Sequence, residues 1–218
     1  MSNQIQEPPQ LGLRERKKLK TRLAISDVAT RLFIERGFEN VTIAQVAEAA
    51  EVSVNTVFNY FTTKEELFFD RGVEFSAAPS RVVRERRKGE SAVAALRRSC
   101  RKLIRDDGTP LIGQRLRPFL SAIEASPALQ ARSRLLIADA ETKLWQTLVE
   151  ETGSDPADPT ARSVAALATG VQAMLMKTLW ERILDGTPDL QLRAELSRLG
   201  ERGFELLLTA AGDYCVRS

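Results

Sequence analysis

The chain has 218 residues, of which 43% are hydrophobic and 28% charged, a balance typical of a folded globular protein rather than a disordered one. Its formal net charge is +3, and it contains no histidine. The lack of histidine excludes Ser-His-Asp and Cys-His nucleophiles, histidine-ligated zinc sites and imidazole acid–base catalysis. The two cysteines, Cys100 and Cys215, are too few for a disulfide framework, so we expect a reducing cytoplasm and neither a metal nor a cofactor.

The beginning of the chain is polar and then strongly basic. Residues 1–13 predict a disordered arm, because they carry two prolines and lack the apolar stretch of a signal peptide or an anchor. An amphipathic helical pattern follows, and Gly37 is expected to end it, since glycine tolerates the left-handed conformation found at helix ends. The basic stretch at the start of this helix consists of Arg14, Arg16, Lys17, Lys18, Lys20 and Arg22, opposed only by Glu15.

Three short helices with clear start signals are expected next. Thr42 and Thr63 can cap the first and the third helix, and each has a Gln or Glu three residues later, in the capping-box position. Ser53 can cap the second helix. Residues 50–53 have the length of a tight interhelical turn, so the first two of these helices predict a helix-turn-helix.

The rest of the chain is predicted to form longer helices separated by Pro, Gly and Asp residues. Pro79 and Gly89 interrupt an arginine-rich segment. We interpret the cations between residues 81 and 105 as a solvated helix face, and the steering of DNA is the alternative. The apolar run 164–180 contains Thr, Gln and Lys, so it predicts a buried helix and not a membrane span. Helical patterns cover residues near 91–105, 110–125, 127–152, 159–185 and 188–212.

The second helix of a helix-turn-helix enters the major groove of DNA while the first crosses the backbone. Val46, Ala47, Val52 and Val57 can pack the angle between the two helices. Phe58 and Phe61 are expected to be core residues. The second helix then exposes Val54, Asn55, Thr56 and Asn59. Asn can bond adenine in a bidentate pair, and Val or Thr can contact the thymine methyl group. Groups able to reach phosphate stand at helix ends or edges, at Thr42, Tyr60 and Lys64.

Residues 21–68, from Thr21-Arg-Leu-Ala-Ile25 to the closing Tyr60-Phe61-Thr-Thr-Lys64-Glu-Glu-Leu67, resemble the DNA-binding domain of the TetR family of regulators. The resemblance implies a homodimeric, all-helical, ligand-responsive repressor. Carried over position by position, it implies phosphate contacts at Thr42, Tyr60 and Lys64. It implies base contacts at Ser53, Val54, Asn55 and Asn59. The expected DNA-binding residues are Thr42, Ser53, Val54, Asn55, Thr56, Asn59, Tyr60, Lys64, Lys20 and Arg22.

Two positions depart from the pattern of this family. Many members have tyrosine where this chain has Phe58, so a hydroxyl contact is missing here. Many members have glycine where this chain has Glu51. If that position needs a positive φ, Glu51 costs about 1 kcal/mol relative to glycine.

The predicted fold class is all-α, with a three-helix helix-turn-helix domain at 14–68 and a helical bundle for ligand binding and dimerisation at 69–218. The pattern 159–185 is apolar on more than one face, so this helix needs more than one neighbour. We expect it to form a two-fold four-helix interface together with the last helix, as in the resembled family. A dimer of this kind predicts a palindromic operator in double-stranded DNA.

The bundle can enclose a pocket for a small apolar effector. Plain core packing is the alternative for each residue of its wall. Residues 126–132 and the helices that follow are similar to a branch of the family associated with acyl-CoA-like ligands, so the effector is expected to be apolar or acyl-CoA-like. The candidate wall residues are Phe119, Ile123, Leu136, Leu144, Trp145, Leu148, Met174 and Trp180.

The sequence therefore favours a cytoplasmic repressor that leaves its operator when an effector binds, with no membrane partner. An activator and a ligand-independent DNA-binding protein remain the alternatives, because the sign of regulation depends on where the operator lies. An enzyme built on the bundle is disfavoured, since the sequence shows no metal-ligand cluster, glycine-rich phosphate loop or nucleophile–base pair.

Overall fold

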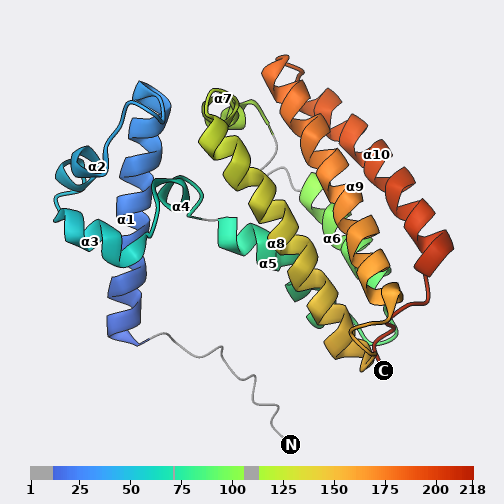
Figure 1. Ribbon diagram of the computed structural model, residues 1–218. Coiled ribbons are helices and arrows are strands. Elements are labelled where there is room, and N and C mark those ends of the chain that lie inside the picture. The colour runs from blue at the N-terminus through green and yellow to red at the C-terminus, as the bar shows by residue number, and fades with distance from the viewer. Residues whose placement is uncertain (1–11, 71, 106–112) are drawn as a thin grey trace, which may run out of the picture. The chain divides into compact units, whose positions relative to one another are not determined.

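The computed structural model describes residues 12–70, 72–105 and 113–218, and these residues form helices and connecting segments without a strand (Figure 1). The predicted all-α fold class is confirmed. The chain divides into two compact units between Asp70 and Arg71. Most of the predicted disordered arm at 1–13 lies outside the described residues, and Leu13 is already the first residue of a helix.

The N-terminal unit consists of one long helix and three short ones, and each short helix begins at its predicted cap. The hydroxyl oxygen of Thr42 accepts the Gln45 N–H, and the Gln45 side chain accepts the Thr42 N–H at 2.8 Å. The hydroxyls of Ser53 and Thr63 cap the next two helices in the same way. The four helices are α1 (Leu13–Arg36), α2 (Ile43–Ala49), α3 (Val54–Tyr60) and α4 (Lys64–Phe68).

Aromatic rings fill the core of this unit. The rings of Phe33, Phe38 and Phe68 pack together with centroid distances of 5.0 to 6.0 Å. Phe61 is buried as predicted, but Phe58 is 53% exposed, so the expectation that it is a core residue is wrong. The reason is helical geometry: Val57 and Phe61 lie four residues apart on the inner face of α3, and Phe58 is turned about 100° away from Val57.

The C-terminal unit agrees with most of the predicted helical ranges. The helix predicted at 127–152 has those bounds, and the others that lie within described residues differ by one or two residues at their ends. Within the predicted range 110–125, a short 3-10 helix precedes the α-helix. The helices are α5 (Gly72–Arg84), α6 (Ala92–Arg105), η1 (Gln114–Leu116), α7 (Arg117–Glu124), α8 (Pro127–Thr152), α9 (Pro159–Leu184) and α10 (Asp189–Ala211).

Helix α5 is the element that the sequence analysis missed. The sequence predicts an interruption at Pro79, yet this residue lies inside α5 and is buried. A proline in a helix interior costs about 3 kcal/mol, because it removes one backbone hydrogen bond and crowds the preceding turn. The extensive packing of α5 against α8 offsets this cost.

The bundle is built from long helices that lie side by side. Figure 1 shows α8, α9 and α10 in a row, and α6 also packs against α10. Its core is mainly aliphatic, as the low aromatic content predicts, with Leu96, Leu144 and Leu148 among its fully or almost fully buried members. At the α9–α10 crossing, a Cβ on Gly203 would lie 2.8 Å from a Val171 methyl group, so glycine permits the close approach.

The prediction that the arginines between 81 and 105 form a solvated face is wrong for several of them. Arg86 is 2% exposed and donates hydrogen bonds to the Val83 and Cys215 carbonyls and to the Glu151 carboxylate. Arg97 and Arg101 both bind Glu201 on α10, and Arg98 binds Glu90. Most of these carboxylates are distant in sequence, so the local pattern could not reveal the pairs.

Among the described helices, none has an apolar stretch long enough to cross a membrane. Cys100 and Cys215 are both free.

Candidate nucleic-acid interface and effector site

The turn between α2 and α3 holds the two helices at a fixed angle. Backbone hydrogen bonds run from Ala50 N–H to the Val46 carbonyl at 2.9 Å and from Val52 N–H to the Ala47 carbonyl at 2.9 Å. Glu51 has a φ of 56°. This position therefore does need the positive φ that glycine, found here in many TetR-family members, adopts without strain. Val46 and Ala47 are buried in the angle as predicted, and so is Val57.

One face of α3 is exposed and carries the residues expected to read bases. Val54 is 39% exposed, and Asn55 and Asn59 are exposed beside it. Neither asparagine side chain makes a hydrogen bond to another residue within the described ranges, so both side-chain amides are available to a ligand. The structure thus brings these three predicted residues together on one surface and adds Phe58, which the sequence analysis had placed in the core.

Three other predicted residues use their hydroxyls locally. The Ser53 and Thr56 hydroxyls lie 2.8 Å apart, and the Ser53 oxygen also accepts the Thr56 N–H. The Thr42 hydroxyl takes part in the capping box with Gln45. These hydroxyls take part in the hydrogen bonds at the starts of α2 and α3. A phosphate contact would therefore use hydroxyls that already cap a helix.

Arg22 is already bound within its own unit. Its Nε donates to the Asp70 carboxylate at 2.6 Å and its Nη1 to the Tyr60 carbonyl at 2.7 Å. The guanidinium carbon also lies 4.4 Å from the centroid of the Phe61 ring. Arg22 therefore joins α1 to the end of α3 and to the residues after α4, and we assign it first to holding α3 in place.

Lys64, which is also expected to contact phosphate, likewise makes contacts within its own unit. Its Nζ lies 4.3 Å from the centroid of the Phe38 ring and 5.6 Å from that of Phe33. Burial lowers the pKa of Lys64, while the carboxylates of Glu39 and Glu65 act in the opposite direction. The ammonium group covers the aromatic core, and the Tyr60 ring packs 6.5 Å from the neighbouring Phe61 ring.

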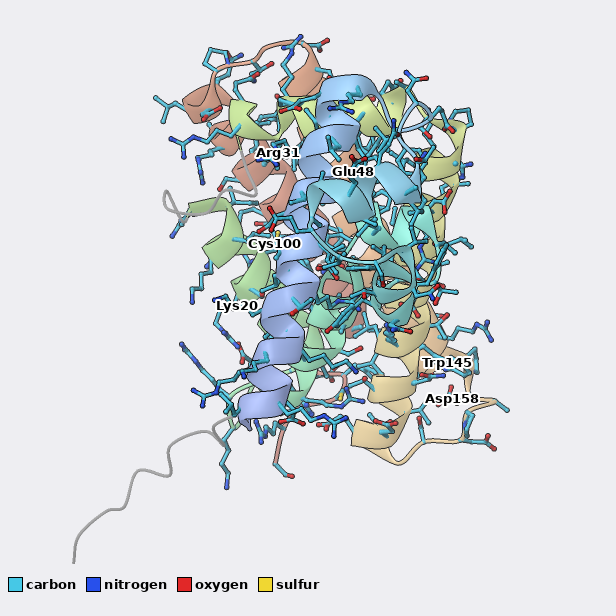
Figure 2. The ribbon with its side chains drawn as sticks, turned by 90° about the vertical axis from the view of Figure 1, so that its left-hand side faces the viewer. Lys20, Arg31, Glu48, Cys100, Trp145 and Asp158 are labelled. Atoms are coloured by element: carbon cyan, nitrogen blue, oxygen red, sulfur yellow. The ribbon has the colours of Figure 1, made fainter. Side chains whose placement is uncertain are left out.

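Positive charge in this unit is concentrated on the first turns of α1. Residues 12–20 are all exposed, and Lys20 extends outward from this part of the helix (Figure 2). Six of the residues from 13 to 22 are cations and one is a carboxylate. From residue 23 to 70 the cations are Arg31, Arg36 and Lys64, and the carboxylates are Asp27, Glu35, Glu39, Glu48, Glu51, Glu65, Glu66 and Asp70. The basic segment is therefore the part of this unit with uncompensated positive charge.

The residues expected to line an effector pocket lie at different depths in the bundle. Ile123, Leu144 and Leu148 are buried, and the last two belong to the aliphatic core. Leu136 is 8% exposed, and Phe119 is half-buried. Met174 is 39% exposed on the outer face of α9, so we remove it from the expected pocket wall.

Five hydroxyl and indole groups of the C-terminal unit are buried without a hydrogen-bond partner among the described residues, and one of them is the Tyr214 hydroxyl after α10. Two of them are the indole N–H groups of Trp145 and Trp180, which are predicted pocket residues. The other two are the hydroxyls of Ser80 on α5 and Thr147 on α8, which sequence reasoning missed because no motif marks them. A buried polar group without a partner costs about 1–3 kcal/mol, so these atoms favour a bound molecule or water at their positions.

Two hollows in the C-terminal unit are lined by other residues. A cavity of about 10 Å³ lies between α6 and α10, next to Cys100 and Glu201. Burial raises the pKa of the Cys100 thiol to about 11, and the nearby Glu201 charge acts in the same direction. A shallow cup of about 550 Å³ lies around Gly89 and Gly212. Neither hollow is lined by a residue of the expected pocket wall.

No cluster of three or more Asp, Glu, Cys or His side chains that could hold a metal ion occurs in the described parts of the chain. The arrangement provides groups for binding: a fixed helix with exposed amides, a basic helical segment, and a bundle with buried polar atoms.

Comparisons with known proteins agree with this geometry. Residues 25–70 match the family model of bacterial regulatory proteins of the tetR family. The HTH-type transcriptional regulator TcmR of Streptomyces glaucescens is 28% identical over 148 residues. That alignment covers 66% of this chain and 66% of TcmR, so the chain spans slightly less than two thirds of that relative.

Two solved structures show the same fold. NalD, the secondary repressor of the MexAB-OprM multidrug efflux pump in Pseudomonas aeruginosa, is 18% identical with a TM-score of 0.53, over 87% of this chain and 96% of NalD. FadR of Thermus thermophilus, a TetR-family repressor in complex with lauroyl-CoA, is 23% identical with a TM-score of 0.50, over 86% of this chain and 93% of FadR. Residues 25–70 therefore match the helix-turn-helix domain of the TetR family of regulators, and the chain as a whole shares the fold of TetR-family transcriptional regulators.

Proposed function

We propose that this protein is a homodimeric, cytoplasmic, non-enzymatic repressor that binds a palindromic operator and leaves it when a small molecule binds the bundle. The observation that carries the proposal is the exposed face of α3, which α2 and the Arg22 side chain of α1 hold in place, and whose two asparagine amides have no partner among the described residues. An activator would use the same surface at a differently placed operator. A ligand-independent DNA-binding protein would use the same surface, but no ligand in the bundle would change its affinity for DNA.

The proposed DNA contacts fall into two groups. Val54, Asn55 and Asn59 face base edges in the major groove. The second group is proposed to contact the phosphate backbone directly or to support residues that contact it. It consists of Thr42, Ser53, Thr56, Tyr60, Lys64, Lys20 and Arg22. The basic turns of α1 supply most of the salt-dependent attraction, because the rest of the N-terminal unit carries more carboxylates than cations.

The outer faces of α9 and α10 are proposed to form the dimer interface. Leu167 is 51% exposed and Leu206 is 59% exposed, and Met174 lies on the same face of α9 as Leu167. Nothing lies within 4 Å of the position that a Cβ on Gly170 would occupy, so a partner helix can approach α9 closely there. A two-fold axis through this face would present two copies of α3 to two half-sites.

The proposed effector has an apolar body and hydrogen-bonding groups, as an acyl-CoA-like molecule has. Leu144, Leu148 and the rings of Trp145 and Trp180 offer apolar surface. The two indole N–H groups and the Ser80 and Thr147 hydroxyls offer donors that lack partners. The solved FadR of Thermus thermophilus, which shares the fold, is in complex with lauroyl-CoA. Binding would favour a conformer of the dimer that no longer fits the operator.

The proposal is tested by measuring DNA binding of the full chain. We expect a specific duplex to bind much more tightly than a scrambled one at the same salt concentration, and sedimentation to give a dimer. Equal affinity for both duplexes would support the ligand-independent binder instead. A reporter gene behind the operator distinguishes repression from activation.

The effector half is tested with lauroyl-CoA, free CoA and laurate. Both tryptophans lie in the C-terminal unit, so their fluorescence should change when the effector binds. Lauroyl-CoA should also release the operator, and the release should weaken in a Thr147→Val variant. Thr142→Val, which alters an exposed threonine on the same helix, is the matched control. Unchanged operator affinity with all three compounds would remove the acyl-CoA-like class.

A further inference from the structure

The exposed face of α3 carries two parallel stripes of different chemistry. Val54 and Phe58 lie four residues apart and form an apolar stripe, and Asn55 and Asn59 form an amide stripe next to it. The opposite face of the helix is occupied by the buried Val57 and its half-buried neighbours. Every side chain that α3 directs outward therefore belongs to one of the two stripes.

The amide stripe matches adenine. An asparagine amide can donate to N7 of adenine and accept from its N6 amino group at the same time, which gives a bidentate contact in the major groove. Asn55 and Asn59 both have their amides free of hydrogen bonds to described residues. They can form such a contact without breaking an existing one.

The apolar stripe matches thymine. The thymine C5-methyl group is the apolar group that the major groove displays, and Val and Phe side chains can pack against it. Phe58 is 53% exposed and Val54 is 39% exposed, although the same unit buries Phe33, Phe38, Phe61 and Phe68. The Phe58 ring is therefore positioned to gain from contact with an apolar group on a ligand.

The stripes contain no group suited to a G·C pair. Guanine is read mainly by Arg or Lys, and cytosine by Asp or Glu. Residues 53–60 include none of these four residue types. The next cation along the chain, Lys64, covers the Phe38 ring, and the carboxylate of Glu51 precedes α3 in the turn.

We propose that the bases of each half-site that face α3 are A·T pairs, with adenine bonded by Asn55 and Asn59 and the thymine methyl packed against Val54 and Phe58. One A·T pair displays both the adenine N6/N7 edge and the thymine methyl in the major groove, so it satisfies both stripes at once. The inference rests on the proposed function, since it requires that α3 enters the major groove.

The first experiment is selection of bound duplexes from a random-sequence pool by the full-length protein. The expected result is a two-fold repeated motif whose half-sites have A·T pairs at the positions that Asn55→Ala and Asn59→Ala variants cease to select. A motif with G·C pairs at those positions would overturn the inference and leave the proposed function intact. Failure to enrich any sequence would overturn the proposed function, and the inference with it.

The second experiment removes one groove feature at a time from the selected duplex. Uracil in place of thymine removes a methyl group, and its loss should weaken binding about fourfold per contacted base. Adenine with carbon in place of N7 removes the acceptor that an asparagine amide uses.

The two base changes should respond to different protein variants. Phe58→Ala should reduce the effect of uracil, with Val54 retaining its share, and keep the effect of the modified adenine. Asn59→Ala should reduce the effect of the modified adenine and keep that of uracil. Phe58→Leu, which keeps an apolar side chain, is the matched control and should retain the uracil effect. An equal uracil effect in the wild type and in Phe58→Ala would show that Phe58 contacts no thymine methyl group. Thermal unfolding should be almost the same in all variants, because the Phe58 ring is exposed.

Discussion

The two units of the protein treat their cations differently. In the N-terminal unit Arg22 and Lys64 lie over aromatic rings and Arg22 also pairs with Asp70, but the other cations on the first turns of α1 are exposed. In the C-terminal unit arginines pair with carboxylates of other helices, as Arg182 does with Glu195 and Arg86 with Glu151. The difference shows that the number of cations in a segment says little about function, whereas the position of their counter-charges says much. A surface that binds phosphate must keep its positive charge uncompensated, and only α1 does so extensively within the described N-terminal unit.

The largest effect is expected where an internal pair is broken. Arg86→Met removes four hydrogen bonds and leaves the Glu151 carboxylate without its partner. We expect a loss of about 3 kcal/mol in the free energy of unfolding, measured in urea at pH 7. Arg84→Met is the matched control, because Arg84 is half-exposed on the same segment and pairs with the exposed Glu150, so its loss should be below about 0.5 kcal/mol. Equal losses in both variants would remove the distinction between buried and exposed pairs.

The basic segment of α1 tests the other side of the comparison. A triple Lys17→Gln, Lys18→Gln and Lys20→Gln variant should bind every duplex more weakly, by about 30- to 100-fold near 0.1 M salt, if about two of the three lysines contact phosphate. The slope of log affinity against log salt should fall by about 2, and the sequence preference should stay the same. Filter binding at several salt concentrations measures both.

The matched control for this variant removes the same charge from the C-terminal unit. Lys88, Lys102 and Lys177 are exposed, and their replacement by Gln should leave the salt slope almost unchanged. If both triple variants lowered the slope equally, net charge rather than the position of the cations would explain DNA affinity.

The pH dependence of stability tests the ion pairs that Glu201 forms in the C-terminal unit. Hydrogen bonds from Arg101, followed by those from Arg97, lower the pKa of Glu201 to about 2, against the opposing effect of burial. Because the pKa is lowered on folding, the stabilisation is present above about pH 4.5 and is lost as pH falls towards 2. Allowing for partial exposure of the carboxylate, we expect Glu201→Gln to lose about 1–2 kcal/mol at pH 7.

The stability gap between the wild type and Glu201→Gln should narrow between about pH 5 and pH 2, as followed by urea unfolding at each pH. Glu205→Gln is the control on the same helix, because Glu205 lies 3.7 Å from Arg202 and both are exposed. A gap that stays constant down to pH 2.5 would mean that the carboxylate charge of Glu201 does not stabilise the bundle.

The two units also differ in how far their sequence predicts their structure. The N-terminal unit follows short-range signals: a capping hydroxyl and its partner lie three residues apart, so Thr42, Ser53 and Thr63 could be identified without the fold. In the bundle, Arg101 and its partner Glu201 are 100 residues apart, and only packing brings them together. Phe58 was misassigned because the pattern alone does not say which side of α3 faces the core. Helix α5 was missed because a local rule about proline was overridden by packing on α8.

The smallest effect concerns the turn, where a local cost remains visible in the folded protein. Glu51 adopts a φ of 56°, in which a Cβ crowds the backbone at a cost of about 1–2 kcal/mol. Glycine relieves this strain but adds about 0.4–1 kcal/mol of chain entropy to the unfolded state, so Glu51→Gly should stabilise the protein by about 0.5–1 kcal/mol. Glu51→Ala keeps the Cβ and should bring no comparable gain, which distinguishes backbone strain from the loss of an exposed carboxylate. Thermal unfolding of the three proteins measures the difference. Because Glu51 also adds negative charge beside the start of α3, both variants should bind DNA slightly more tightly at low salt, and only the glycine variant should do so with a raised melting temperature.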